Sequence, residues 1–335
     1  MGPVDALSRP LKALRVSVTD RCNFRCPYCM PKETFGEGFR FMDRAEILTF
    51  EEIVRLARIF VDLGVVKVRL TGGEPLLRKG LPDLVARLTQ VPGLREVALT
   101  TNGSLLTRLA GPLKAAGLNR VTVSLDSLDP IRFQANADTG ILLDQVLAGL
   151  AAAKAAGFTG TKLNCVLRRG VNDADILPLA QFARIHGYTL RFIEFMDVGT
   201  RNGWRLDDVV PAAEVAQLIH RRWPIERFWK SAPNCVAQHW RYLDGAGEVG
   251  VIASVTEPFC AGCDRARLSA DGSLFTCLFA AEGTDLKGFL RAGASDAELA
   301  ALVEARWKRR DDRYSEQRSA DTAHLPRAEM FHLGG

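Results

Sequence analysis

The sequence predicts an α/β protein, an incomplete (β/α)6 barrel of the TIM type followed by a C-terminal extension. Two observations predict it. Short β-branched runs alternate with longer amphipathic stretches, which is typical of parallel βα units. Polar residues gather where the predicted strands end, and in such barrels this end of the strands carries the active site. Because six strands do not close an eight-stranded barrel, another part of the chain must cover the open side.

The predicted elements follow one another in order through the first 198 residues. Strands are expected at 14–19, 66–71, 96–100, 120–125, 161–167 and 190–195. Helices are expected at 50–63, 81–90, 105–116, 142–156 and 176–186. Four of these helices are followed by a glycine, the residue that most readily takes the left-handed conformation at a helix end. The polar strand ends are Thr71-Gly72-Gly73-Glu74-Pro75, Thr100-Thr101-Asn102-Gly103 and Ser124-Leu125-Asp126-Ser127.

After Val198 this alternation stops, and we divide the chain there into a barrel domain, 1–198, and a C-terminal domain, 199–335. The second part carries isolated aromatic and proline-containing segments and a glycine-rich hairpin pattern around 244–250. A late helix is expected at 297–308. The highly charged run 309–318 that follows is expected to be a solvated helix end or a mobile segment rather than a nucleic-acid-binding arm.

The composition excludes several classes of protein. Of the 335 residues 47% are hydrophobic and 25% charged, and the net charge is +5, so a mainly disordered protein and a bulk nucleic-acid binder are not expected. The sequence lacks an export signal and a long apolar run, which predicts a cytoplasmic protein without a membrane partner. In a reducing compartment the eight cysteines are expected to serve metals or catalysis rather than disulfides.

Three of these cysteines, Cys22, Cys26 and Cys29, form a C-x3-C-x2-C pattern in the loop after the first predicted strand. Three thiolates on one short loop can bind three irons of a 4Fe-4S cube, which leaves the fourth iron open to another ligand. A structural zinc site is the alternative, but zinc prefers four closed ligands and neither a histidine nor a fourth cysteine lies nearby.

This triplet, with an aromatic residue before its last cysteine, and the Gly72-Gly73-Glu74-Pro75 run resemble the radical S-adenosylmethionine (SAM) enzymes. The resemblance implies that the open iron chelates SAM, that Gly73 brings the backbone close to the methionine amine, and that a reduced cube cleaves SAM to a 5′-deoxyadenosyl radical. It further implies SAM contacts from Tyr28, Ser124 and Met196. Taken alone, these three residues are more often ordinary packing residues.

A second triplet, Cys260, Cys263 and Cys277, follows a C-x2-C-x13-C pattern. A second cube with an open iron is the simplest interpretation, and a zinc site completed by Cys235 or His239 is the alternative. Arg265 and Arg267 follow at once, and alternation in an extended segment places them on one face, where their guanidiniums could bind phosphate.

Further basic residues lie on or near the predicted strands. They are Arg15, Lys67, Arg69, Lys162 and Arg191. A buried charge needs a partner, and for any one of these residues an internal carboxylate such as Asp20, Glu74 or Asp126 would serve. For the whole set such carboxylates are too few, which favours a polyphosphate ligand.

The full pattern closely resembles the GTP 3′,8-cyclase family of molybdenum cofactor biosynthesis. The matching segments are 15–20, 28–31, 69–75, 100–103, 124–127, 162–164, 192–199, 258–278 and Gly334-Gly335. The resemblance implies that the second open iron binds the guanine of GTP. The residues that it implies hold the nucleotide are Arg15, Arg69, Thr100, Lys162, Arg265, Ala266 and Arg267. No side chain is assigned as a catalytic group.

The same resemblance implies the reaction and its partners. The deoxyadenosyl radical would take hydrogen from C3′ of the ribose, and the carbon radical would attack guanine C8. The product, 3′,8-cyclo-7,8-dihydro-GTP, would pass to the cyclic pyranopterin monophosphate synthase. Gly334 and Gly335 would reach back into the site. The one-electron donor is not identified, and a homodimer is left open.

One stretch departs from the family pattern, and two other functions are left open. Between 133 and 142 a basic residue and a Thr-Gly-Arg turn are expected, but the chain has Gln134-Ala135-Asn136-Ala137-Asp138-Thr139-Gly140-Ile141. A peptide-modifying radical SAM enzyme with an auxiliary cluster is one alternative, and a non-enzymatic zinc protein is the other. Cys165 is expected to be a small core residue.

Overall fold

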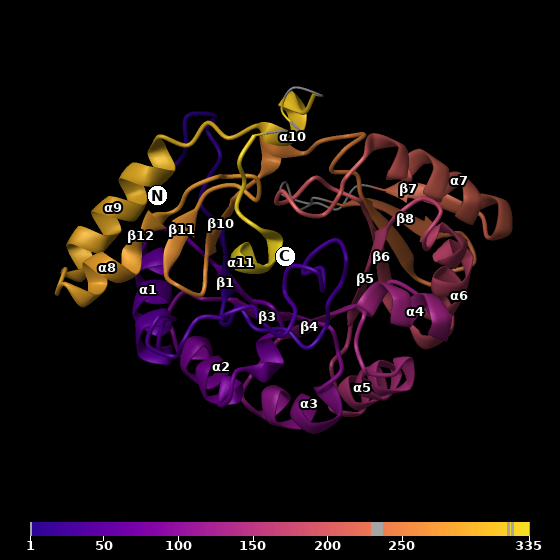
Figure 1. The fold of residues 1–335 in the computed structure, drawn as a ribbon, viewed down its shortest axis with the longest axis horizontal. Coiled ribbons are helices and arrows are strands. Elements are labelled where there is room, and N and C mark those ends of the chain that lie inside the picture. The colour runs from indigo at the N-terminus through magenta and orange to yellow at the C-terminus, as the bar shows by residue number, and fades with distance from the viewer. Residues whose placement is uncertain (1, 229–236, 320–321, 323–324, 335) are drawn as a thin grey trace.

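The computed structural model describes residues 2–228, 237–319, 322 and 325–334. Within them one continuous sheet curves around the middle of the molecule, with helices on its outer side (Figure 1). Its six central strands are β1 (Ala13–Ser17), β2 (Lys67–Thr71), β3 (Glu96–Thr101), β4 (Arg120–Ser124), β5 (Lys162–Leu167) and β6 (Thr189–Glu194). They are parallel and neighbour one another in sequence order. The predicted strands and barrel topology are therefore confirmed.

The helices on the outer side also follow the prediction. They are α1 (Phe50–Asp62), α2 (Leu81–Thr89), α3 (Leu106–Ala115), α5 (Leu143–Ala155) and α6 (Ile176–His186). The Thr49 side chain and Glu52 close a capping box at the start of α1, which satisfies backbone donors that a helix start leaves without partners. The short helix α4 (Pro130–Ala137) and α7 (Ala212–Arg222) were not predicted.

Strands from the C-terminal part extend both edges of this sheet. They are β7 (Ile225–Phe228), β8 (Gln238–Tyr242), β9 (Glu248–Ile252), β10 (Arg265–Leu268), β11 (Ser273–Phe275) and β12 (Thr284–Asp285). Strand β10 pairs in parallel with β1, and β9 pairs in parallel with β6, so the order is β12-β11-β10-β1-β2-β3-β4-β5-β6-β9-β8-β7. The domain boundary at residue 198 stays a prediction.

The last part of the chain crosses the open side of the curved sheet. After α8 (Leu286–Arg291) and α9 (Asp296–Lys308), it passes through α10 (Tyr314–Gln317) and ends in α11 (Met330–Leu333). Figure 1 shows α11, in yellow, inside the curve of the sheet. This segment therefore supplies part of the cover that six strands alone would lack.

The charged run 309–318 does not match the prediction of a solvated segment. Arg310 is only 2% exposed, and Arg318 forms an ion pair of 2.9 Å with the buried Asp197. The prediction was wrong at these residues because each of the two charges has a buried carboxylate partner, which a pattern of alternating charges does not reveal.

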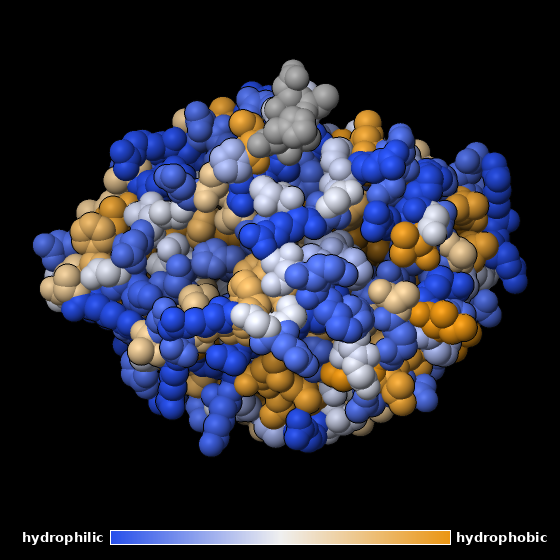
Figure 2. Space-filling view, viewed as in Figure 1, coloured by the Kyte–Doolittle hydropathy of each residue, from blue (hydrophilic) through white to orange (hydrophobic). Residues whose placement is uncertain are grey.

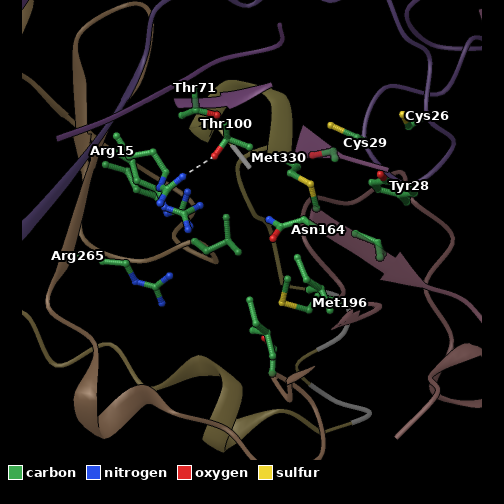
Figure 3. Close-up of a pocket in the computed structure, with 18 of the residues that line it drawn as sticks. Arg15, Cys26, Tyr28, Cys29, Thr71, Thr100, Asn164, Met196, Arg265 and Met330 are labelled. Atoms are coloured by element: carbon green, nitrogen blue, oxygen red, sulfur yellow. Dashed lines mark hydrogen bonds between the residues drawn. The ribbon is translucent and has the colours of Figure 1, made fainter. Parts of the chain in front are cut away.

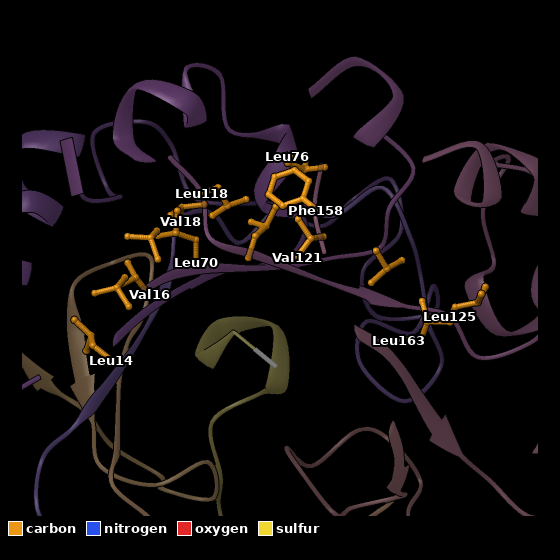
Figure 4. Packing of buried hydrophobic residues seen from close by; sticks show 14 of the residues in the cluster. Leu14, Val16, Val18, Leu70, Leu76, Leu118, Val121, Leu125, Phe158 and Leu163 are labelled. Atoms are coloured by element: carbon orange, nitrogen blue, oxygen red, sulfur yellow. The ribbon is translucent and has the colours of Figure 1, made fainter. Parts of the chain in front are cut away.

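The main core lies between the strands and the outer helices. Leu14, Val16, Leu70, Val121 and Leu163 are almost fully buried in it, and Figure 4 shows such residues along the strands, with α11 on the opposite side of the sheet. Alternate strand residues point to opposite faces, so the residues between these core positions face inward. No helix among the described residues is long and apolar enough to cross a membrane.

Candidate active site

One pocket on the inner side of the sheet is lined by residues from both ends of the chain. Its lining includes all six triplet cysteines, Cys22, Cys26, Cys29, Cys260, Cys263 and Cys277, and the arginines Arg15, Arg69, Arg191, Arg265 and Arg267. In Figure 3, Arg15 and Arg265 lie on one side and Cys26 and Cys29 on the other, with Asn164 between them. The molecular face of Figure 2 is mostly hydrophilic around a hollowed centre.

Asparagine side chains hold the loop of the first triplet. Asn102, just after β3, donates to the side-chain oxygen of Asn23 over 2.8 Å, and Asn23 donates to Ser104 over 3.0 Å. The stretch that departs from the family pattern packs on the same loop, because the Thr139 hydroxyl donates to the Asn23 carbonyl over 2.8 Å. Phe133 meets Phe24 edge to face, with ring centroids 5.9 Å apart. These bonds fix where the three thiols lie.

The thiols of the first triplet are buried, and burial disfavours their ionised form. Burial, and then the charge of Glu74, raise the pKa of the Cys22 thiol to about 12, and the pKa values of Cys26 and Cys29 are raised as well, mainly by burial. A cationic cluster would displace these protons on binding. The backbone N–H of Phe24 donates to the Cys22 sulfur over 3.4 Å, which is the kind of bond that stabilises a metal-bound thiolate.

The second triplet lies in a more electropositive setting. Burial alone would raise the pKa of Cys263, but Arg265 and Arg310 outweigh it and lower the pKa to about 7. Burial raises the pKa of Cys277 to about 11, and the Phe279 N–H donates to its sulfur over 3.5 Å. Among the described residues, no three His, Cys, Asp or Glu side chains are placed to hold a single metal ion. A cube differs, because its three protein thiolates bind three separate irons.

The two glycines after β2 are required by close packing against the chain before the first triplet. A Cβ on Gly73 would lie 2.3 Å from the Arg21 carbonyl oxygen, and one on Gly72 would lie 2.6 Å from that of Thr19. The Gly73 and Glu74 N–H groups donate to these same two carbonyls over 2.8 Å. The glycines therefore fasten the end of β2 to the loop that carries the cysteines.

Strand register explains why the arginines cluster. Arg15 of β1 is paired in register with Arg69 of β2 on one side and Arg267 of β10 on the other, so three guanidiniums form a row across three parallel strands. Burial, and then the charges of Arg267 and its neighbours, hold the pKa of Arg15 well below its usual range. Burial also lowers the pKa of Arg69 to about 9 and that of Arg267 to about 10. An anion in the pocket would relieve this repulsion.

The carboxylates considered as internal partners do not neutralise this row. Asp20 accepts the Met42 N–H over 2.7 Å. Glu74 accepts from Thr101 and Asn102, and burial raises its pKa to about 7. Asp126 accepts from the Tyr28 hydroxyl over 2.7 Å. Within the described residues these three carboxylates therefore bond to other groups, whereas Lys67 does pair with an internal carboxylate, Glu96, over 3.0 Å.

Most other predicted residues line the same pocket. Tyr28, Gly73, Thr100, Ser124 and Met196 are all in its lining. Lys162 lies at the start of β5, outside that lining, and Ala266 is fully buried behind the arginine row. Gly335 and Cys235 lie outside the described residues. Gly334 packs on Thr71, and its carbonyl accepts from Arg267 over 2.8 Å.

Two further residues that were not singled out as site residues also line the pocket. They are Asn136 of α4 and Asn164 of β5, and Asn164 lies in the matching segment 162–164. Asn164 accepts two bonds from Arg191, of 3.0 and 2.8 Å. Pairing of β5 with β6, which periodicity does not reveal, places Asn164 next to Arg191.

Two family models match the chain. A Radical SAM superfamily model matches residues 16–183, and a model described as Molybdenum Cofactor Synthesis C matches residues 188–316. A solved structure of anSMEcpe with bound AdoMet shares the fold, with a TM-score of 0.50 and 16% identity over 64% of this chain and 58% of that one.

Curated relatives match over nearly the full length. The chain is 58% identical to a GTP 3′,8-cyclase of Acidothermus cellulolyticus, over 95% of this chain and 89% of the relative. It is 50% identical to a GTP 3′,8-cyclase of Xanthomonas axonopodis pv. citri, over 99% of this chain and 98% of the relative. The chain therefore belongs to the radical SAM superfamily and, within it, to the GTP 3′,8-cyclase family.

Proposed function

We propose that this chain converts GTP into 3′,8-cyclo-7,8-dihydro-GTP with SAM as the radical source, in molybdenum cofactor biosynthesis. The observation that carries the proposal is that one pocket is lined by both cysteine triplets and by the arginine row. A site for SAM chemistry alone would not require a second set of thiols and three arginines in register. A radical enzyme that modifies peptides would have no use for this concentration of positive charge.

The first triplet would hold the 4Fe-4S cluster of the superfamily, and the second triplet would hold another. When bound, the first cluster and SAM supply the reductive cleavage that yields a 5′-deoxyadenosyl radical. The residues proposed to line the SAM site are Tyr28, Gly73, Ser124 and Met196. The hydrogen bond from Tyr28 to Asp126 orients its ring in the pocket wall.

Arg15, Arg69, Arg265 and Arg267 would hold the triphosphate. Arg69 is preoriented because it donates to Thr100 over 3.0 Å and to Thr122 over 3.2 Å, and preorganised charge-assisted bonds favour phosphate. The position of Arg265, next to Cys263, would bring the nucleotide close to the second triplet. Roles for Lys162 and Ala266 stay predictions.

The C-terminal segment would exclude water from the bound nucleotide. Phe331 of α11 packs on Phe35 with ring centroids 4.7 Å apart, and Arg267 holds the Gly334 carbonyl. The segment thus contacts both the loop after the first triplet and the arginine row.

The remaining expectations concern partners. A cyclic pyranopterin monophosphate synthase would consume the product, and a one-electron donor, not identified, would reduce the cluster. The homodimer, the cytoplasmic location and the domain boundary stay predictions.

Anaerobic incubation with GTP, SAM and a reductant, followed by mass analysis of the nucleotide, tests the activity. The wild-type chain is expected to form the cyclised nucleotide and to hold about eight irons, two cubes. Absence of a new nucleotide alongside intact SAM cleavage would reject GTP as the substrate. Iron absent altogether, with zinc in its place, would support the zinc protein.

The arginines can be tested separately. Arg265→Ala or Arg267→Ala is expected to weaken GTP binding about tenfold or more, because a charge-assisted pair contributes roughly 1.5–3 kcal/mol, while SAM cleavage stays detectable. The exposed Arg309 supplies the matched control, Arg309→Ala. Equal loss of SAM cleavage and GTP affinity would contradict this division of roles.

A further inference from the structure

The N-terminal segment 3–11, here called the hook, contains a buried carboxylate that joins two arginines. The Asp5 side chain is fully buried. One of its oxygens accepts from the backbone N–H groups of Leu7 and Arg9, over 2.9 and 2.8 Å. The other accepts from Arg9 Nε over 2.6 Å and from Arg310 Nη1 over 3.0 Å. Asp5 thus orients two guanidiniums that lie 301 positions apart in the sequence.

Each of these arginines holds the backbone of a cysteine in the second triplet. Arg9 Nη1 donates to the Cys260 carbonyl over 2.8 Å, and Arg310 Nη1 donates to the Cys263 carbonyl over 2.7 Å. Arg9 also donates to the Asp312 carbonyl over 2.8 Å. The hook and the segment after α9 therefore form a clamp that holds the backbone of the loop carrying these two thiols.

The two arginines of the clamp are themselves held in place by hydrogen bonds and by packing. The Trp307 indole donates to the Arg9 carbonyl over 3.1 Å, and the Arg310 guanidinium lies 4.6 Å from the centre of the Trp307 ring. The Ala6 N–H donates to the Arg310 carbonyl over 3.1 Å. Arg9, Trp307 and Arg310 are each at most 2% exposed.

The clamp also places donors at the pocket. Arg9 and Arg310 both contribute to the pocket lining. The Nη2 group of Arg9 is buried and has no hydrogen-bond partner within the described parts of the chain, although a buried unpaired guanidinium donor is costly. N–H donors and positive charge beside an iron-sulfur cluster stabilise its reduced, more negative form.

We propose that Arg9 and Arg310, oriented by Asp5, are positioning residues for the cluster of the second triplet: they fix the Cys260 and Cys263 backbone and raise the reduction potential of that cluster. This inference rests on the proposed second cluster. The clamp residues would act through the backbone of Cys260 and Cys263 rather than as ligands. The hook thereby couples the N-terminal segment to the redox properties of a site near the other end of the chain.

The test uses a background in which only the second triplet can bind a cluster. In the full-length chain Cys22, Cys26 and Cys29 are all changed to serine, and the protein is reconstituted anaerobically with iron and sulfide. About four irons per chain are expected. Into this background go Arg9→Met, Arg310→Met and the matched control Arg309→Met, which changes an exposed arginine next to the clamp. The readouts are iron content, rate of iron loss to a chelator, and midpoint potential followed by electron paramagnetic resonance.

Both clamp variants are expected to lower the midpoint potential and to lose iron about tenfold faster, as loss of a second-layer hydrogen bond typically does. The control is expected to change neither. Arg310→Lys keeps the positive charge but lacks the planar guanidinium that can donate two bonds side by side. Compared with Arg310→Met, it is expected to recover part of the midpoint potential and little of the iron retention. It also gives a result if Arg310→Met does not fold.

The two hypotheses fail in different ways. If the background binds no iron, the second cluster itself is rejected. If it binds four irons, but Arg9→Met and the Arg310 variants keep the potential and the rate of iron loss of the background, the clamp has no positioning role and the inference is overturned.

Discussion

Helix α5 should reject a single added methyl group at Gly149, even though helix propensity favours it. Gly149 is buried, and a Cβ there would lie 2.3 Å from the Gly103 carbonyl oxygen and 3.2 Å from the Leu106 side chain. Ordinary contact begins near 3.4 Å, so helix and turn would have to separate by about 1 Å. Overpacking of this kind costs about 1–3 kcal/mol, whereas replacing glycine by alanine in a helix interior otherwise gains about 1 kcal/mol.

The measurement is the free energy of unfolding of the reduced apoprotein in denaturant. Gly149→Ala is expected to lower it by up to about 2 kcal/mol, the overpacking cost less the propensity gain. Ala151→Gly, at an exposed position of the same helix, measures the propensity alone and is expected to cost about 1 kcal/mol. If Gly149→Ala instead stabilises the protein by the amount that Ala151→Gly loses, the contact with the turn is not rigid and the reasoning is refuted.

The remaining predictions concern the thiols and a buried acid. Cys26→Ser is expected to reduce reconstituted iron from about eight to about four per chain and to abolish deoxyadenosine formation. The control Cys165→Ala, in the core of β5, should change neither the iron content nor deoxyadenosine formation. If Cys26→Ser formed deoxyadenosine at the wild-type rate, Cys26 would be excluded from the mechanism. Burial raises the pKa of Asp126 from its usual 3.8 to about 6. Since the folded state then binds the Asp126 proton more tightly than the unfolded state does, the free energy of unfolding of the apoprotein should fall by up to about 3 kcal/mol as the pH rises from 3.8 to about 6. Asp126→Asn should remove that part of the pH dependence, and an unchanged profile would contradict the assignment.

The barrel could be predicted from the chain because its signals are local. A run of β-branched residues, an N-cap such as Thr49 and a glycine after a helix each act within a few residues. The unpredicted α4 and α7 are short or follow proline, and the charged segment after α9 looked solvated because the buried carboxylates Asp5 and Asp197 that pair with Arg310 and Arg318 lie far away in sequence.

Part of the site was equally local. The first cysteine triplet lies within one short stretch and the second within two. The Gly72-Gly73 pair marks a place where no side chain fits against the Thr19 and Arg21 carbonyls. The sequence could not reveal that Asp126 accepts from Tyr28 rather than from an arginine, because that choice depends on which strand ends face each other.

By itself, the sequence determined the residue types and their order: six βα units, two sets of three thiols, and arginines at alternate positions of strands. The tertiary structure alone decided that β10 pairs in parallel with β1, which brings Arg267 beside Arg15 and places both triplets on one pocket. The physical reason is that short-range propensities fix the period of each strand, whereas the register between β1 and β10, whose paired residues are 252 positions apart, depends on packing of the whole core.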